Sequence, residues 1–340
     1  MKAIVLAGGY ATRLWPVTKE RPKMLLPVGE TTVIDRILGD LESDDRISQV
    51  YLSTNERFSD TFRDHLSRGK FDKPKISVEE TKTEDEKLGV ISAMAQLVDR
   101  ESIHEETIVI AGDNLIGFDV GEFIDFFDRQ NEPVLAAYDV GSLEKAKAYG
   151  LVTLNGETVV DFQEKPEQPD STIVSIACYG FTPEVLDSLS TYLADGNNPD
   201  EPGWFIQWLQ NRTTVSAFTF DDAWFDIGTL ESYLDAVSWH LDGDALVAES
   251  ASVGDAEIGS NVHIMPGARI TDSNVENSVI FPNVTVEGSH VESSVIDRNA
   301  RVENRTLVSD LIGADSVKQT GDADRILTDP IQSADGGYDA

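Results

Sequence analysis

A repeat of 16 residues runs through the C-terminal part of this 340-residue chain and constrains its fold more than any other feature. Polar turn residues punctuate the repeat, and Asn283 and Asn299 occupy equivalent positions. Strands this short cannot bury an apolar face alone, so successive repeats must stack as coils. The alternative is an ordinary β-rich region in which the periodicity arises by chance. The aligned apolar columns are Val275, Val291 and Leu307; Val279, Val295 and Leu311; and Ile280, Ile296 and Ile312.

Branched residues also recur six apart within the repeat, as at Ile258, Ile264 and Ile270. This spacing resembles that of hexapeptide repeats, which fold as a left-handed parallel β-helix. The resemblance implies a small β-helix over residues 250–315. Residues 318–340 are rich in Asp and Gly, and we expect them to form an acidic, disordered tail.

Strand-like and helix-like segments alternate before this region. Short apolar, β-branched runs predict buried strands at 3–6, 49–53, 107–111 and 134–138. Stretches with a period near 3.6 predict helices at 33–41, 58–66, 90–98 and 123–127. After Gly150, strands at 151–154, 158–162, 173–181 and 215–220, with helices from Pro183 and Thr229, predict an added mixed sheet. The first 240 residues therefore predict an α/β domain with a mostly parallel, mixed sheet and ligands at the carboxyl ends of its strands.

The chain is strongly acidic, with 27 Lys and Arg against 61 Asp and Glu and a net charge of −34. The excess is dispersed, since residues 1–240 carry −22 and residues 241–340 carry −12. Such a surface repels phosphodiester backbones and anionic lipid, which argues against nucleic-acid or membrane partners. It resembles the surfaces of proteins from salt-loving organisms, where concentrated salt screens the repulsion. We therefore hypothesise a halophilic protein.

The apolar runs are short, whereas a membrane-spanning helix needs about 20 apolar residues. The N-terminal run before Gly8 is also shorter than the roughly 7 to 15 residues of a secretory signal core. The single cysteine, Cys178, excludes an intramolecular disulfide and is expected to pack in the core. These features together predict a cytoplasmic protein without a transmembrane segment.

The segment most informative about function is 6–27, LAGGYATRLWPVTKERPKMLLP, which follows a predicted strand. Gly8 and Gly9 let the backbone turn sharply and approach phosphate oxygens, and Arg13 and Lys23 add two cations. This combination suits a nucleoside triphosphate, because charge on a transferring phosphoryl group needs positive donors already in place. The string matches neither GxxxxGK[ST] nor GxGxxG, so P-loop and dinucleotide-binding interpretations fit poorly.

This segment resembles the signature of sugar-1-phosphate nucleotidylyltransferases, LAGGxGTRLxPxTxxxxK followed by a proline. The resemblance implies a Rossmann-like nucleotidyltransferase domain over residues 1–240. It assigns Arg13 and Lys23 to catalysis, where they stabilise the transition state and the departing pyrophosphate. Ala11 replaces the usual glycine, and a methyl group there costs about 1 kcal/mol if the backbone needs a positive φ. The implied nucleotide-binding residues in the loop are Leu6, Gly8, Gly9 and Thr12.

Two carboxylates follow short apolar segments, Asp113 in AGDN and Asp226 in WFDIGT. Two such carboxylates can share one Mg²⁺, which prefers a few carboxylates with phosphate oxygens and water. The resemblance places the metal ligands of the family at these positions, so we expect Mg²⁺ as the cofactor. Taken alone, each aspartate fits helix capping or turn formation better than metal binding, and the presence of the glycine-rich loop reverses this preference.

Three further residues are assigned to the sugar phosphate by the resemblance. It places Glu164 on sugar hydroxyls, Lys165 on the phosphate and the Gly150 backbone on the sugar. Without the rest of the motif, Glu164 and Lys165 would read as an exposed pair before a turn proline. The run KLGVISAM at 87–94 resembles the turn that recognises the base, with Gly89 against the base.

The implied reaction transfers a nucleoside monophosphate from an NTP to a hexose 1-phosphate, releasing pyrophosphate. GDN at 112–114 and RPK at 21–23 favour glucose 1-phosphate with dTTP or UTP, while RLWP at 13–16 also occurs in mannose-1-phosphate guanylyltransferases. Another alternative is a non-catalytic subunit that senses an NDP-sugar. A β-helix that transfers acyl groups is also conceivable, but a structural role is preferred, and we expect a homo-oligomer.

Overall fold

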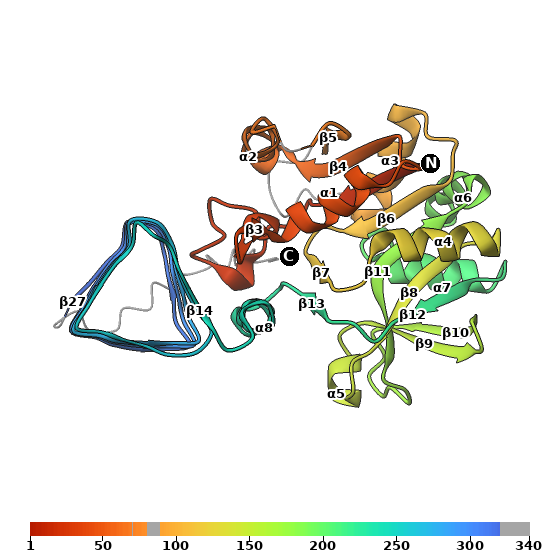
Figure 1. Cartoon of the computed structure of the whole chain (residues 1–340). Helices are drawn as coiled ribbons and strands as arrows, with labels where there is room; N and C mark the ends of the chain where they lie inside the picture. Colours follow the sequence, from red (N-terminus) through yellow and green to blue (C-terminus); the bar gives the residue numbers. More distant parts are fainter. Residues whose placement is uncertain (70, 80–88, 320–340) are drawn as a thin grey trace, which may run out of the picture.

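The computed structural model describes residues 1–69, 71–79 and 89–319. An α/β domain and a triangular stack of coils lie side by side, joined through helix α8 (Leu230–Leu241), as Figure 1 shows. None of the helices in the described part of the chain is long and apolar enough to cross a membrane.

The described residues of the α/β domain form a nine-stranded sheet with the order β5-β4-β1-β6-β11-β8-β12-β10-β9. Seven strands point the same way, because β10 and β11 run antiparallel to all their sheet neighbours whereas β5, β4, β1 and β6, and then β8 and β12, pair in parallel. The mostly parallel, mixed sheet is thus confirmed. The strands are β1 (Lys2–Leu6), β4 (Gln49–Asn55), β5 (Pro74–Glu79), β6 (Thr107–Ala111), β8 (Val134–Asp139), β9 (Gly150–Asn155), β10 (Thr158–Glu164), β11 (Ile173–Phe181) and β12 (Ser216–Thr219).

The strands that follow Gly150 do not form the separate sheet expected from the sequence. Strand β11 inserts between β6 and β8 and also pairs with β9, so the later strands extend the first sheet. Its central position explains why a nine-residue run of buried and half-buried residues is needed there. Cys178 lies in this strand and is completely buried, as predicted.

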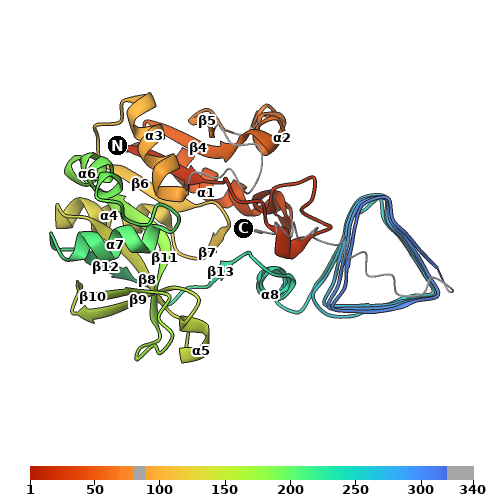
Figure 2. The ribbon, with the colours of Figure 1, turned by 180° about the vertical axis from the view of Figure 1, so that it is seen from behind.

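Helices cover both faces of the sheet, which gives three layers (Figure 2). Alternate strand residues supply the two faces: Ala3 and Val5 of β1 join one core cluster and Ile4 joins the other. The first face carries α1 (Val33–Ser43), α2 (Glu56–Leu66) and α4 (Val120–Gln130); the second carries α3 (Val90–Glu101), α6 (Pro183–Ala194) and α7 (Pro202–Gln210). A four-residue helix, α5, covers Leu143–Ala146.

Two small antiparallel ribbons complete the domain. Strand β7 (Asn114–Ile116) pairs with β13 (Trp224–Asp226), and β2 (Pro27–Val28) pairs with β3 (Thr31–Thr32). Short 3₁₀ turns lie at Thr12–Leu14 and Lys23–Leu25, within the segment singled out from the sequence.

The coil stack is a left-handed parallel β-helix with three sheets, one along each side of the triangle in Figure 1. The predicted columns are confirmed, because Val275, Val291 and Leu307 are successive partners in one sheet and Ile280, Ile296 and Ile312 in another. The strands of the three sheets are β14 (Ala245–Val247), β17 (Val262–Ile264), β20 (Val279–Ile280), β23 (Val295–Ile296) and β26 (Leu311–Ile312); β15 (Ser252–Gly254), β18 (Arg269–Thr271), β21 (Thr285–Glu287), β24 (Arg301–Glu303) and β27 (Val317–Gln319); and β16 (Glu257–Ile258), β19 (Asn274–Glu276), β22 (His290–Glu292) and β25 (Thr306–Val308).

The β-helix is longer at both ends than the predicted range 250–315. Within the described residues it runs from β14, at Ala245, to β27, whose last residue is Gln319. Lys318 and Gln319, which we expected in the disordered tail, instead pair with β24 and extend one side of the triangle. The rest of that tail, residues 320–340, lies outside the described residues.

Buried serines allow a coil of 16 residues to close where three hexapeptides would need 18. One side advances six residues, from Ile280 to Val286, and the following sides advance five. At a five-residue corner the Ser278 hydroxyl donates to the carbonyl of Glu276 at 2.6 Å and accepts from the amide of Ser294 at 3.0 Å. Ser278 therefore satisfies backbone groups that the tight corner removes from the strand ladder.

Candidate functional site

A cavity of about 830 Å³ opens at the carboxyl ends of β1 and β6, where the strand and helix pattern placed the ligand. Every residue assigned to the site from the sequence lines this cavity. They are Leu6, Gly8, Gly9, Thr12, Arg13, Lys23, Gly89, Asp113, Gly150, Glu164, Lys165 and Asp226.

The glycine-rich loop follows β1 and is held by side chains from β4. The Asn55 amide donates to the carbonyl of Gly8 at 2.8 Å, and the Thr54 hydroxyl donates to the carbonyl of Ala7 at 3.1 Å. A β-carbon at Gly8 would lie 2.9 Å from a carboxyl oxygen of Glu79, so a side chain there requires Glu79 to move. Because Gly8 has no side chain, the backbone of the loop faces the cavity directly.

Ala11 has φ 51° and ψ 45°, in the left-handed region. Alanine replaces the glycine that is usual at this position, and the expected cost depended on a positive φ. Because φ is positive, the backbone strain at Ala11 is about 1 kcal/mol. The Thr18 hydroxyl donates to the Ala11 carbonyl at 2.8 Å and helps to hold the strained turn. Arg13, two residues after Ala11, lies close to Gly228. A β-carbon at Gly228 would lie 3.0 Å from the Arg13 guanidinium.

Lys23 is the second cation and is only 9% exposed. It begins the 3₁₀ turn Lys23–Leu25, and its ammonium forms an ion pair with Asp113. Lysine is buried in proteins almost only when its charge is paired. The pairing therefore explains how the fold keeps this cation at the wall of the cavity.

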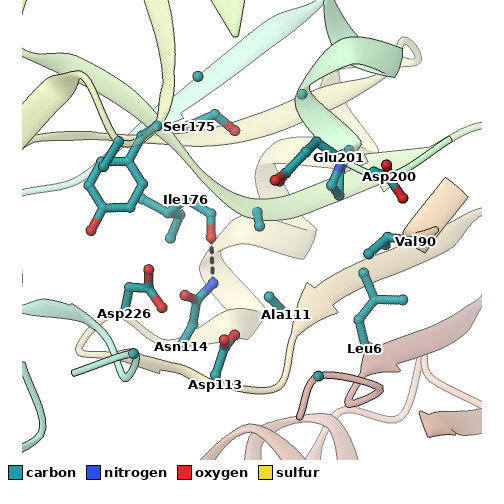
Figure 3. Close-up of a pocket in the computed structure, with 18 of the residues that line it drawn as sticks. Leu6, Val90, Ala111, Asp113, Asn114, Ser175, Ile176, Asp200, Glu201 and Asp226 are labelled. Atoms are coloured by element: carbon teal, nitrogen blue, oxygen red, sulfur yellow. Dashed lines mark hydrogen bonds between the residues drawn. The ribbon is translucent and has the colours of Figure 1, made fainter. Parts of the chain in front are cut away.

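The two aspartates come together through the β7–β13 ribbon. Asp226 lies opposite Asn114, and the amide of Ile227 donates to the carbonyl of Asp113 at 3.0 Å. Figure 3 shows both carboxylates beside Asn114 on one wall of the cavity. Burial raises the pKa of Asp226, and the neighbouring Asp113 raises it further, while Lys23 and Arg13 act in the opposite direction.

Such a pair of crowded carboxylates suits a divalent cation, which relieves their repulsion. Among the described residues there is no group of three or more His, Cys, Asp or Glu side chains that could hold a metal. A metal at Asp113 and Asp226 would thus take its other ligands from substrate and water, which is the usual situation for Mg²⁺. The donor set fits this ion.

Glu164 also lines the cavity and lies between two glycines. A β-carbon at Gly203 would lie 1.6 Å from its carboxyl group, and one at Gly150 would lie 2.9 Å away. Burial raises the pKa of Glu164 to about 7; Lys165 lowers it and Glu201 raises it. This carboxyl group is therefore placed to exchange hydrogen bonds with hydroxyl groups.

Lys165 follows Glu164 with a positive φ of 45°, and its amide donates to the carbonyl of Tyr149 at 3.1 Å. Its ammonium pairs with Glu201 at 2.6 Å, and both side chains are 44% exposed. A cation in such a half-exposed pair remains accessible to an incoming anion.

Gly89 is the N-cap of helix α3 and has φ 83°, and a β-carbon there would lie 2.4 Å from the carbonyl of Pro199. Glu79, at the end of β5, also lines this part of the cavity, and its carboxylate accepts from the Ser53 hydroxyl at 3.0 Å. Burial raises the pKa of Glu79. Residues 87 and 88 of the predicted base-binding turn lie outside the described residues.

Sequence reasoning missed several residues that shape the site. Asn114 is 3% exposed; its amide nitrogen donates to the carbonyl of Ile176, as Figure 3 shows, and its oxygen accepts from the Trp224 ring at 3.2 Å. It ties β7 to both β11 and β13. The GDN tripeptide was the signal for it, whereas nothing in the local sequence marked Glu79, Glu201 or Gly203.

The fold and the cavity define a class of protein: an α/β nucleotide-binding domain equipped for phosphoryl chemistry. A loop of exposed backbone amides, two cations and a carboxylate pair face one another at the carboxyl edge of its sheet. The chain belongs to the nucleotidyl transferase family, which matches residues 2–242. A second match, to the GlmU-like C-terminal hexapeptide family, covers residues 241–324.

Individual relatives carry several nucleotide specificities. A protein of Sulfolobus acidocaldarius named "Putative mannose-1-phosphate guanyltransferase" is 29% identical over 69% of this chain and 61% of its own length. A glucose-1-phosphate adenylyltransferase of Mycoplasma mobile is 28% identical over 83% of this chain and 81% of its own length. The chain thus spans only about three fifths of the first of these relatives.

A solved structure of a "Putative Glucose-1-Phosphate Thymidylyltransferase" from Bacillus anthracis, in complex with a sucrose, has the same fold. It superposes with a TM-score of 0.61 at 23% identity and covers 71% of this chain and 95% of its own.

Proposed function

We propose that this protein is a sugar-1-phosphate nucleotidylyltransferase that converts an NTP and a hexose 1-phosphate into an NDP-sugar and pyrophosphate. The observation that carries the proposal is the arrangement of one cavity. The loop of Gly8, the cations Arg13 and Lys23, the aspartate pair, Gly89 and Glu164 all line this one cavity. A triphosphate and a sugar phosphate can therefore meet within it.

In the proposed reaction an oxygen of the sugar phosphate attacks the α-phosphorus directly, and the bond to the β-phosphate oxygen breaks. The attacking phosphate is already ionised, so no side-chain nucleophile is needed, and catalysis consists of alignment and charge neutralisation. Arg13 and Lys23 stabilise the charge that develops on the departing pyrophosphate. Leu6, Gly8, Gly9 and Thr12 hold the nucleotide.

Lys165 binds the phosphate of the sugar, while Glu164 and the Gly150 backbone bind its hydroxyls. To do so Lys165 exchanges the Glu201 carboxylate for a phosphate dianion. Asp113 and Asp226 would hold Mg²⁺, which supplies further neutralisation of phosphate charge when bound.

The choice of nucleotide base depends on the cavity residues Leu6, Glu79 and Gly89. GDN and RPK favour dTTP or UTP with glucose 1-phosphate. The Glu79 carboxylate favours the second candidate, GTP with mannose 1-phosphate. Two acceptor oxygens match the two adjacent N–H donors of guanine, whereas uracil and thymine offer one donor between two carbonyls. The similarity to the Sulfolobus protein points the same way.

A substrate matrix tests this proposal, with ATP, GTP, UTP, CTP and dTTP each paired with glucose, galactose, mannose and N-acetylglucosamine 1-phosphates in molar salt. Pyrophosphate release from one pair, abolished by EDTA and restored by Mg²⁺, is expected. Binding of an NDP-sugar without turnover of any pair would instead identify the sensor subunit. Glu79→Gln is expected to lower selectivity for GTP if GTP is the substrate.

We further propose that the β-helix mediates self-association. We also propose that the acidic surface is adapted to a high concentration of salt inside the cell. Large apolar side chains remain exposed on the coils, among them Val308 and Val317. Light scattering in high salt tests the assembly, and a monomer there would contradict it.

A further inference from the structure

The catalytic segment rests on the β-helix. Residues Leu14, Val17, Leu26 and Val28 share one continuous apolar cluster with interior residues of the coils such as Ile280. Figures 1 and 2 both show this red segment between the sheet and the triangular stack. The segment that carries Arg13 and Lys23 is therefore packed on a second domain as well as on its own.

Arg21 makes a largely buried polar contact across this boundary. Its guanidinium donates to a carboxyl oxygen of Asp297 at 3.0 Å and lies over the ring of Phe281 at 4.5 Å. The Arg21 side chain is 15% exposed and the Asp297 side chain 4%. Removal of one partner from a buried, hydrogen-bonded ion pair is strongly destabilising, because the other charge is left buried without a partner.

Asp297 is itself rigidly held by the coil. The oxygen that accepts from Arg21 also accepts from the amide of Arg298 at 2.7 Å. The backbone amide of Asp297 donates to the carbonyl of Ile312 in the next coil at 2.9 Å. The carboxylate is therefore fixed relative to the stack.

Only Pro22 separates Arg21 from Lys23, and its ring restricts the backbone, which has φ −63° here. Beyond it, the amide of Leu25 donates to the carbonyl of Pro22 and that of Leu26 to the carbonyl of Lys23, both at 3.0 Å. A displacement of Arg21 is thus passed to Lys23 through the conformationally restricted Pro22.

We infer that the Arg21–Asp297 contact positions Lys23 in the cavity, so that the β-helix is a brace for the catalytic segment. The inference rests on the proposed function for the role of Lys23. Arg21 is a positioning residue, since it does not line the cavity. Loss of the contact is expected to lower kcat by about 10-fold to 10²-fold, because small misplacements of a catalytic group carry that cost.

The test compares full-length Asp297→Asn and Arg21→Lys with a matched control. Glu20 and Arg298 are the sequence neighbours of this pair and form a second contact at 3.1 Å, but Glu20 is exposed and Arg298 is half-exposed. Glu20→Gln is expected to leave kcat unchanged. Asp297→Asn is expected to lower kcat with little change in KM for the hexose 1-phosphate, because Lys165 binds that substrate and Arg21 does not contact Lys165. If Asp297→Asn fails to fold, Arg21→Lys, which keeps the charge and loses the planar fork, carries the test.

A cycle with Lys23→Met separates positioning from general destabilisation. If the contact acts through Lys23, Asp297→Asn has no further effect on kcat in the Lys23→Met background. The same fold-loss in both backgrounds, measured on folded protein, would overturn the inference. So would a kcat for Asp297→Asn or Arg21→Lys equal to that of Glu20→Gln.

A second readout is independent of activity. Hydrogen exchange at the amides of Leu25 and Leu26 is expected to quicken in Asp297→Asn, or in Arg21→Lys, and not in Glu20→Gln. Unchanged exchange defeats the brace even if the enzyme is active. A wild-type chain that turns over no substrate pair defeats the proposed function, whereas the exchange result still decides whether the β-helix holds the segment.

Discussion

Replacement of Lys23 by methionine is the most direct test of the proposed chemistry. The side chain keeps nearly the same length and loses its charge, and the position is 9% exposed, so water does not replace the lost cation freely. A unit charge about 4 Å from a phosphate oxygen interacts by about 4 kcal/mol at an effective dielectric near 20. Loss of one such preorganised group typically lowers kcat by about 10² to 10³. We expect this loss for Lys23→Met.

The assay is pyrophosphate release at saturating Mg²⁺ and both substrates, with thermal unfolding to verify the folded state. Lys19→Met is the matched control, because Lys19 lies in the same segment but is exposed beside Trp15 and does not line the cavity. It is expected to retain full turnover. The reasoning is refuted if Lys23→Met keeps more than about a tenth of wild-type kcat, or if Lys19→Met is equally impaired.

Three further predictions concern stability. Burial raises the pKa of Glu164 to about 7 from its usual 4.5, so between these values the native state holds a proton that the unfolded state has released. The free energy of unfolding should therefore fall as pH rises from about 4.5 to about 7. Denaturant titrations across this range should show a shallower fall for Glu164→Gln than for the wild type. An equal pH dependence of the two proteins would contradict this prediction. Ser278→Ala removes the acceptor of the buried Ser294 amide and should cost about 1 to 3 kcal/mol. Exposed Ser43→Ala should change the unfolding free energy by less than about 0.5 kcal/mol. Finally, the net charge of −34 predicts a melting temperature that rises from about 0.1 M to about 1 M KCl, as the Debye length falls from about 10 Å to about 3 Å; maximal stability in dilute buffer would refute the halophilic hypothesis.

Strands with a strong local pattern could be predicted to the residue. Thr107–Ala111 and Ile173–Phe181 are mostly apolar runs without a charged residue, and the structure has the same bounds. Strand β5, Pro74–Glu79, escaped notice because it is an edge strand whose single buried residue, Ser77, is polar. Helix α7, Pro202–Gln210, was missed because its short aromatic run has no clear polar face.

The same distinction applies to the site. Residues in contiguous motifs, such as Gly8 and Lys23, were recognisable because one loop must both turn and carry charge. Glu201 and Gly203 reach the cavity from the start of α7, and Glu79 reaches it from the edge of the sheet. Their places depend on how the sheet is assembled, which local spacing does not encode.

By itself the sequence determined the 16-residue coil, the glycine-rich loop and the excess of carboxylates, because each is a property of neighbouring residues or of composition. Only the tertiary structure decided that the segment carrying Arg13 and Lys23 rests on the β-helix. Arg21 and Asp297 stand 276 residues apart, and neither lies in a periodic pattern that points to the other. Their contact exists because packing of two apolar surfaces brings the loop and the coil corner together, and that packing is a property of the whole chain.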